Sequence, residues 1–231
     1  MVGSEDGQGG AAVLCSGGLD SAVLLADVAR ATRPGRVVPI YVSVGLAWEQ
    51  EEIAMLDALL HAAPFEGVDP IVSLRFDMRD VYSPTHWAVR GEPPAFDTPD
   101  GDVYLEGRNI VLLTKASVYM ARAGLSRVFL GPLAGNPFPD ATPAFFEAMA
   151  RSLSLGLAAP IEIAAPFASL HKADVIKLGQ KLGVPLELTL SCMQPSNGWH
   201  CGRCSKCRER RDAFREAGMD DPARYAVAPA R

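Results

Sequence analysis

The sequence lacks the features that would place this chain in a membrane or on nucleic acid. No apolar run approaches the roughly 18 residues that a membrane-spanning helix requires. The first ten residues, MVGSEDGQGG, are acidic and glycine-rich, whereas a secretory signal peptide is basic and then apolar. The formal net charge of −5 provides no general attraction to nucleic acid. We therefore expect a cytoplasmic protein with no membrane or nucleic-acid partner and with a flexible N-terminus at residues 1–10.

Cysteine is scarce through most of the chain. Cys15 stands alone and is expected to pack in a strand, because no neighbouring group activates its thiol. The other four cysteines, Cys192, Cys201, Cys204 and Cys207, have the spacing C-x8-C-x2-C-x2-C. In a reducing compartment such a cluster indicates a metal site and not a set of disulfides. Four thiolates at this spacing fill the tetrahedral coordination of Zn²⁺, so the pattern predicts one structural zinc ion per chain.

The surroundings of the cysteine cluster contain other polar candidates. His200 adjoins Cys201 and competes as a ligand, although four cysteines already suffice. Basic side chains are expected to offset the thiolate charge or, alternatively, to contact a nucleotide or RNA. They are Arg203, Lys206, Arg208, Arg210 and Arg211.

Apolar segments with strand character alternate with segments of helical period along the chain. Strands are expected at 11–15, 36–44, 69–76, 127–133 and 161–167. Helices are expected at 21–31, 49–63, 109–123, 143–155 and 171–183. The helix at 49–63 is expected to bury one apolar side, formed by Ile53, Leu56, Leu59 and Leu60. Residues 77–107 interrupt the alternation and are predicted to form an ordered functional loop. Strands that alternate with helices form a parallel sheet covered on both faces, so the predicted fold class is α/β.

The string SGGLDS, at residues 16–21, lies between the first expected strand and helix. Glycines there let successive backbone N–H groups converge, and the helix N-terminus adds partial positive charge, which makes a cradle for anions. A plain turn with Ser or Asp capping the helix is the alternative. The string resembles the SGGxDS signature of the PP-loop ATP pyrophosphatases. The resemblance implies that the β- and γ-phosphates of ATP bind at Ser16, Gly17, Gly18, Leu19, Asp20 and Ser21.

Together with this loop, two further elements resemble the 7-cyano-7-deazaguanine synthase family of queuosine-precursor biosynthesis. These elements are GRN at 107–109 and the tail CGRCSKCRERRDAFREAGMDDPARY. The resemblance implies a Rossmann-like PP-loop domain at 11–188 with a zinc-binding segment at 189–231 packed on it, a homodimer, and Mg²⁺ with ATP. The implied enzyme adenylates the carboxylate of 7-carboxy-7-deazaguanine, captures it with ammonia as an amide, and dehydrates the amide to the nitrile. AMP and pyrophosphate are the implied by-products.

The same resemblance implies roles for polar residues outside the loop. Arg108 and Asn109 match the GRN element and are predicted to bind ATP, with a helix cap and a surface arginine as the alternative. Lys172 matches a family lysine and is predicted to be catalytic together with Asp20, by stabilising charge that develops on the α-phosphate. A solvated helix lysine is the alternative for Lys172.

Two segments depart from the family pattern. SVGLAWEQEE, at 43–52, keeps only Gly45 and an acidic position, and PFPDATPAFF, at 137–146, has Ala141 and Thr142 where cysteine and arginine are expected. Both departures predict a divergent paralogue that applies the same chemistry to 7-carboxy-7-deazaguanine or a related planar acid. The predicted substrate-binding residues are Trp48, Trp87, Phe138 and Asp140, and buried aromatic packing is the alternative for the three rings.

Two other functions remain open at this point. PP-loops also support the modification of tRNA bases, and a protein carboxyl is another possible acceptor. The acidic net charge and the absence of an appended RNA-binding domain count against tRNA. A non-catalytic nucleotide-binding subunit is the third interpretation, which would bind ATP without turning it over.

Overall fold

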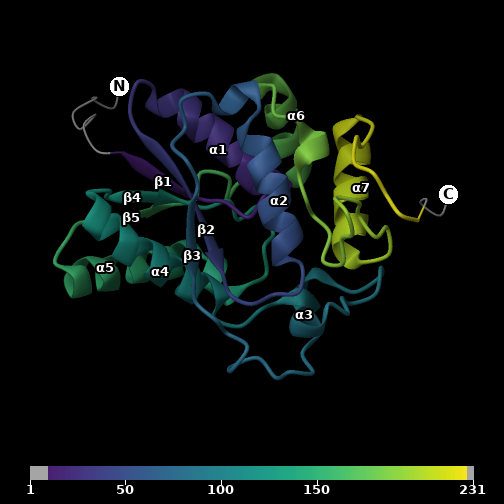
Figure 1. Ribbon diagram of the computed structural model, residues 1–231, viewed down its shortest axis with the longest axis horizontal. Coiled ribbons are helices and arrows are strands. Elements are labelled where there is room, and N and C mark those ends of the chain that lie inside the picture. The colour runs from purple at the N-terminus through teal and green to yellow at the C-terminus, as the bar shows by residue number, and fades with distance from the viewer. Residues whose placement is uncertain (1–9, 228–231) are drawn as a thin grey trace.

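The computed structural model describes residues 10–227 of the chain. The predicted flexible stretch at 1–10 lies outside the described residues, apart from Gly10. Five parallel strands form one sheet in the order β3-β2-β1-β4-β5 (Figure 1). This sheet confirms the α/β fold expected from the sequence. The strands are β1 (Ala11–Leu14), β2 (Val37–Ser43), β3 (Val72–Arg75), β4 (Arg127–Phe129) and β5 (Glu162–Ala164).

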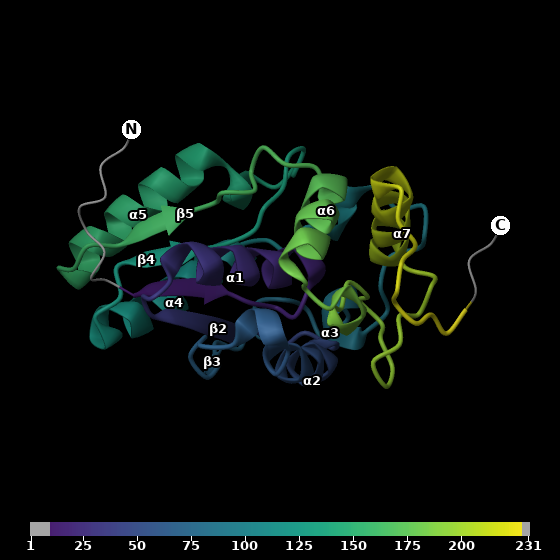
Figure 2. The same ribbon diagram turned by 90° about the horizontal axis from the view of Figure 1, so that it is seen from above.

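Helices cover both faces of the sheet (Figure 1 and Figure 2). Alternate residues of a strand point to opposite faces, and β1 accordingly contributes to two separate cores. Ala11 and Val13 pack on the side of α1, α2 and α6, whereas Ala12 packs on the side of α4 and α5. The helices are α1 (Leu19–Thr32), α2 (Glu49–Leu60), α4 (Arg108–Ala123), α5 (Pro143–Leu157) and α6 (Lys172–Leu182).

The strand order reverses at β1. The chain moves from β1 to β2 and β3 on one side and later returns to β4 on the other side of β1. Such a reversal opens a crevice at the carboxyl ends of the two central strands, where α/β proteins bind ligands. The SGGLDS loop follows β1 directly and therefore lies at this crevice.

Helix α2 buries a different stripe from the one that its apolar residues predict. Ile53 was expected on the buried side, but 41% of its surface is exposed. The buried positions are Glu49, Glu52, Leu56 and Leu59, whose spacing of three, four and three residues follows one face of a helix. The prediction for Ile53 is wrong because this face begins with two acidic side chains, which a search for apolar residues passes over.

Residues 76–107 cross the carboxyl edge of the sheet as an ordered connection between β3 and α4, as expected. They include the short helix α3 (Trp87–Arg90) and a 3₁₀ turn at Asp100–Val103. The connection adds Met78, Tyr82 and Leu105 to the core on the α4 side. Val103 and Leu105 of this connection line the cavities that the SGGLDS loop also lines.

The C-terminal segment returns to the same edge. Helix α7 (Ser205–Ala217) packs against α6, away from the sheet (Figure 2). The backbone N–H of Leu190 donates to the carbonyl of Gly17 at 2.8 Å, which attaches this segment directly to the SGGLDS loop. Within residues 10–227, no helix is long and apolar enough to cross a membrane.

Candidate functional site

The SGGLDS loop turns sharply at Gly17. This residue has φ of +72°, and a Cβ placed on it would lie 2.8 Å from the carbonyl oxygen of Glu52 in α2. Both the left-handed backbone and the close approach of α2 therefore require glycine. The loop is held between α2 on one side and Leu190 of the C-terminal segment on the other.

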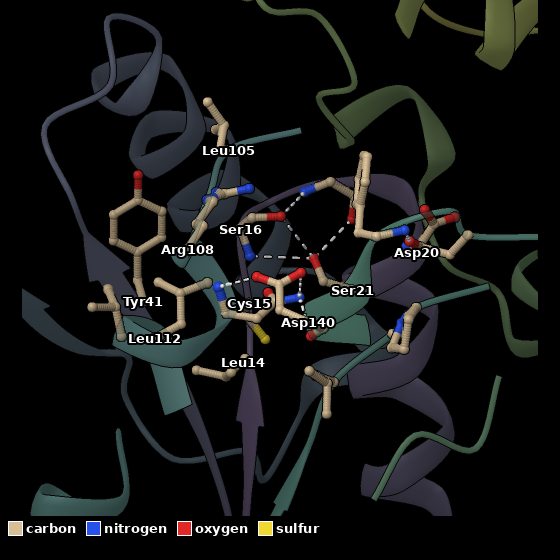
Figure 3. Close-up of a pocket in the computed structure, with 18 of the residues that line it drawn as sticks. Leu14, Cys15, Ser16, Asp20, Ser21, Tyr41, Leu105, Arg108, Leu112 and Asp140 are labelled. Carbon is tan, nitrogen blue, oxygen red and sulfur yellow. Dashed lines mark hydrogen bonds between the residues drawn. The ribbon is translucent and has the colours of Figure 1, made fainter. Parts of the chain in front are cut away.

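Serine hydroxyls organise the interior of the loop (Figure 3). The hydroxyl of Ser21 donates to the carbonyl of Gly18 at 3.0 Å and accepts from the backbone N–H of Ser16 at 3.3 Å. The N–H of Gly18 donates to the hydroxyl of Ser16 at 3.3 Å. Gly18 is the N-cap of α1, and no side chain caps that end of the helix. The structure therefore does not show the capped plain turn that was the alternative interpretation.

Two adjoining cavities meet at this loop. The first cavity, of about 290 Å³, lies over the carboxyl ends of β1 and β2 and reaches the start of α4. The second cavity, of about 380 Å³, lies between the loop, the start of α2, Lys172 and the C-terminal segment. Residues that line both cavities include Ser16, Gly18, Asp20, Arg108 and Phe138. The loop thus separates a site near the sheet from a site near the cysteine cluster.

Arg108 and Asn109 begin α4 next to the loop, as the sequence predicted, but they differ in their contacts. Arg108 faces both cavities, and its buried Nε has no hydrogen-bond partner among the described residues. Asn109 is already engaged, because its Nδ2 donates to the carbonyl of Asp140 at 3.0 Å and its backbone N–H donates to the Asp140 carboxylate at 3.1 Å. Arg108 is therefore free to bind an anion, whereas Asn109 and Asp140 hold each other at the wall of the first cavity.

A chain of alternating charges runs from the loop to α7. Lys172 Nζ lies 3.3 Å from Asp20 Oδ2 and also makes a short ion pair with Glu209. Lys206 Nζ lies 2.6 Å from the second carboxylate oxygen of Glu209. All four side chains line the second cavity, and the buried Oδ1 of Asp20 has no partner in the described part of the chain. Glu209 was not assigned to this site from sequence, because it lies far along the chain in α7. Lys206 was named only among the basic side chains near the cysteines, with a nucleotide contact as one alternative.

Burial and pairing shift the pKa values along this chain of charges. Burial raises the pKa of Asp20, although Lys172 opposes the shift. For Lys172 burial acts in the other direction, but the charges of Asp20 and Glu209 outweigh it and hold the pKa above its ordinary value. Burial would raise the pKa of Glu209, but Lys172 and Lys206 lower it to about 2. Lys172 is therefore cationic beside the loop at neutral pH, which suits the stabilisation of phosphate charge.

The three predicted aromatic residues line the second cavity and also pack against other rings. Trp48 and Trp87 are stacked with ring centroids 5.9 Å apart and an angle of 12° between their planes. Phe138 stacks on Tyr104 at 5.0 Å. The packing of these rings on other rings is therefore observed, and their role in substrate binding stays a prediction.

Glu52 is a site residue that the sequence analysis missed. Its carboxylate accepts from the Tyr41 hydroxyl at 2.8 Å and from the Trp48 indole N–H at 3.1 Å, and it lines the second cavity. Burial raises the pKa of Glu52 to about 7, with the charge of Arg108 opposing the shift. The signal in the sequence is an acid that occupies a core position of the helical pattern, four residues before Leu56.

The four clustered cysteines come together in a closed, buried group. The sulfur atoms of Cys192, Cys201, Cys204 and Cys207 all lie within 4.8 Å of one another. Two of the separations are 3.5 and 3.9 Å, close to the edge of about 3.8 Å that a tetrahedron of Zn–S bonds of about 2.3 Å would have. The group can therefore hold a metal ion. Cys15 lies elsewhere, buried at the end of β1, as expected of a packing residue.

The basic side chains near the cysteines have other partners. Arg210 is fully buried and donates to Asp221 and to the Thr189 hydroxyl, and Arg208 donates to the carbonyl of Thr98. The sulfur atoms accept from backbone N–H groups instead, including those of Gln194, Cys201 and Arg203. His200 lies outside the sulfur group and accepts from the backbone N–H of Ser191 through Nε2. Arg208 and Arg210 therefore make their hydrogen bonds away from the sulfur atoms, and the offset of thiolate charge by these side chains stays a prediction.

Comparison with known proteins agrees with the loop and cysteine motifs. Residues 10–218 match the family described as queuosine biosynthesis protein QueC. The chain is 36% identical to the 7-cyano-7-deazaguanine synthase of Methanothrix thermoacetophila, over 94% of this chain and 99% of that protein. It is 34% identical to the protein of the same name from Thermoplasma volcanium, over 95% of this chain and 92% of that protein.

A solved structure gives independent support for the fold. The U34-tRNA thiolase NcsA from Methanococcus maripaludis, which carries a 4Fe–4S cluster, aligns with a TM-score of 0.51 at 12% identity. The alignment covers 94% of this chain and 70% of the thiolase, and it shows a shared fold only. By contrast, the family match extends over most of the chain and includes both the SGGLDS loop and the cysteines. The protein therefore belongs to the queuosine biosynthesis protein QueC family.

Proposed function

We propose that this protein is an ATP-dependent carbon–nitrogen ligase that converts 7-carboxy-7-deazaguanine and ammonia into 7-cyano-7-deazaguanine. The observation that carries the proposal is the phosphate loop between two cavities, with Asp20 Oδ1 and Arg108 Nε buried there and unpartnered among the described residues. Unpaired buried polar groups are costly, so a site that keeps them indicates a polar ligand. Relatives named 7-cyano-7-deazaguanine synthase support the choice of product.

The proposed positions of the two substrates follow from the linings of the two cavities. The first cavity combines apolar side chains such as Leu14 and Leu112 with the end of β2, which suits the adenosine of ATP. The N–H groups of the loop and the start of α1 would bind the phosphates. The planar acid would then occupy the second cavity beside Trp48 and Trp87, with its carboxylate directed toward the loop.

The proposed reaction has two activation steps. A carboxylate oxygen of the acid attacks the α-phosphorus of ATP, and the bond to the β-phosphate oxygen breaks to release pyrophosphate. Ammonia then attacks the acyl carbon, and AMP leaves to give the amide. In the second round the amide oxygen attacks another ATP, pyrophosphate leaves again, and loss of AMP and two protons gives the nitrile. Lys172 and Arg108 would stabilise the charge that develops on the α-phosphate in both rounds.

Two metals belong to the proposal. Mg²⁺ bound with ATP would neutralise phosphate charge, and the unpartnered carboxylate oxygen of Asp20 fits a role in holding it. We assign Zn²⁺ to the four-cysteine group, because complete thiolate coordination suits a structural zinc ion. Such an ion would fix the start of α7, which carries Lys206 and Glu209 into the second cavity.

A homodimer completes the proposed assembly, and analytical sedimentation can check this oligomeric state.

The test is a product assay with 7-carboxy-7-deazaguanine, ATP, Mg²⁺ and ammonium. Mass spectrometry is expected to detect the amide and then the nitrile, with one AMP and one pyrophosphate released for each activation step. Formation of ADP and orthophosphate without AMP would contradict the assignment of the loop. Release of AMP with other planar acids but not with 7-carboxy-7-deazaguanine would support the activation chemistry and reject the proposed substrate.

A further inference from the structure

A buried carboxylate with spare acceptor capacity faces the second cavity. Only 7% of the Glu52 surface is exposed, and what remains exposed contributes to the wall of the cavity. Oε2 accepts one hydrogen bond from Tyr41 and Oε1 accepts one from Trp48. Because each carboxylate oxygen can accept a second hydrogen bond, two acceptor positions remain on the same group. The mechanism described above does not use them.

The surroundings of Glu52 favour a flat ligand. Trp48 holds the carboxylate through its indole N–H and is stacked on Trp87, and both indoles line the cavity beside Glu52. A planar ring that lies against this wall would present its edge, and not its face, to the carboxylate. A pair of parallel acceptors at a ring edge matches a pair of adjacent donors on the ligand.

Positive charge lines the same cavity. Lys172 lines it together with the SGGLDS loop, and Arg108 also lines it but lies close enough to Glu52 for its charge to oppose the rise in the Glu52 pKa. A ligand with an anionic group at one end and a pair of N–H donors at the other would therefore meet complementary charge at both ends. 2-Amino-4-oxopyrimidine rings carry such a donor pair in their ring N–H and exocyclic amino group.

We propose that Glu52 is a specificity-determining residue that accepts hydrogen bonds from the ring N–H and 2-amino group of the planar acid. The inference rests on the proposed function, because it assigns a binding partner to one end of the proposed substrate. That end is the one opposite the reacting carboxylate. Tyr41 and Trp48 act as positioning residues, since their hydrogen bonds fix the orientation of the Glu52 carboxylate. A polar site of this kind rejects an analogue that lacks a donor, because the buried carboxylate is then left unpaired.

The experiment compares two acids that differ only in the 2-amino group. Steady-state kinetics of AMP release are measured with 7-carboxy-7-deazaguanine and with its analogue that has hydrogen in place of the amino group. The wild-type protein is expected to favour the amino compound by about ten- to hundredfold in kcat/KM, mainly through KM. In Glu52→Gln the amide presents a donor to the substrate donors, so the preference is expected to fall to within about threefold.

Glu49→Gln is the matched control. Glu49 lies one turn earlier in α2 and is also buried, but its carboxylate accepts from the backbone N–H groups of Val44 and Gly45. Glu49 is absent from the lining of the second cavity. This variant is expected to keep the wild-type preference for the amino compound, whatever its effect on stability.

The outcomes separate the inference from the function on which it rests. A wild-type protein that produces the nitrile but turns over both acids equally well would overturn the role of Glu52 and leave the proposed function intact. This measurement needs no variant, so it decides the matter even if Glu52→Gln does not fold. A folded Glu52→Gln protein that keeps the wild-type preference would also overturn it. No reaction of the wild type with either acid would instead reject the proposed function.

Discussion

The SGGLDS loop and the cysteine group lie near each other but are built in opposite ways. The loop lines two open cavities and keeps a buried Asp20 oxygen without a partner among the described residues. The cysteine group is buried, and its sulfur atoms accept hydrogen bonds from the backbone around them. Sites that keep polar groups unsatisfied bind ligands at the expense of stability, whereas closed metal sites contribute to folding. Substitutions in the loop should therefore reduce activity with little unfolding. Substitutions of the cysteines should instead lower the stability of the C-terminal segment before they affect activity.

The largest effect is expected for Cys204→Ser. Removing one thiolate from a closed four-thiolate site should release the metal, whose binding contributes roughly 10 kcal/mol to the folding of small zinc modules. The segment from Thr189 to α7 is then expected to lose protection against hydrogen exchange. Elemental analysis should find about one zinc per wild-type chain and far less in the variant. Full retention of zinc and of exchange protection in Cys204→Ser would contradict the structural role of the group.

Asp20→Asn tests the loop side of the comparison. The substitution keeps the shape of the side chain but removes the negative charge that faces Lys172 and exchanges one carboxylate oxygen for an amide nitrogen. Exchange between ATP and labelled pyrophosphate in the presence of the acid should fall by about 10²- to 10³-fold, as for the loss of one preorganised electrostatic group. The midpoint of thermal unfolding should change little.

The matched control for Asp20→Asn lies on the same helix. Asp27 is in α1 and makes an ion pair with Arg30, away from both cavities. Asp27→Asn is expected to leave the exchange rate unchanged. An equal loss of exchange in both variants would indicate a general effect on α1 and not a role at the loop.

A smaller, pH-dependent effect is expected at Glu52. Its pKa is raised to about 7 in the folded protein by burial, so the folded chain retains a proton that the unfolded chain has already lost. The contribution of Glu52 to the free energy of unfolding is fully present below about pH 4.5. This contribution, on the order of 3 kcal/mol, is lost as the pH rises through about 7. Denaturant unfolding at pH 5 and pH 8 should show this loss in the wild type and not in Glu52→Gln. Parallel pH dependence in the two proteins would rule out the proposed titration.

The smallest effect concerns the contact between the two regions. Glu209 on α7 pairs with Lys172, which also pairs with Asp20 of the loop. In Glu209→Gln the lysine keeps only one carboxylate partner, so we expect about a tenfold loss in kcat for pyrophosphate exchange with little change in KM for ATP. Glu209→Asp should recover part of the rate. Glu216→Gln, at an exposed position of the same helix, is the control and should behave as wild type.

Much of the fold was predictable because its signals are local. The alternation of apolar strands with amphipathic helices indicated a parallel α/β sheet. Helix α6 ends at Leu182 with Gly183 as its C-cap, close to the end expected for the helix at 171–183. The wrong prediction for Ile53 also came from a local signal. Ile53 was expected to be buried because it is apolar, but the face that α2 presents to the protein begins with Glu49 and Glu52. Periodicity identifies a buried face only when that face is apolar.

The sequence by itself determined the two motifs of this protein, because SGGLDS and the spaced cysteines each lie within a short stretch of chain. Each motif depends only on local backbone geometry or on the spacing of a few side chains. Only the tertiary structure decided what stands around them. Packing of α7 on α6 brings Glu209 to Lys172, and packing of α2 beside Gly17 brings Glu52 to the second cavity. These contacts join residues that are distant in sequence. The charges of these residues interact strongly only where burial removes the water that would otherwise screen them.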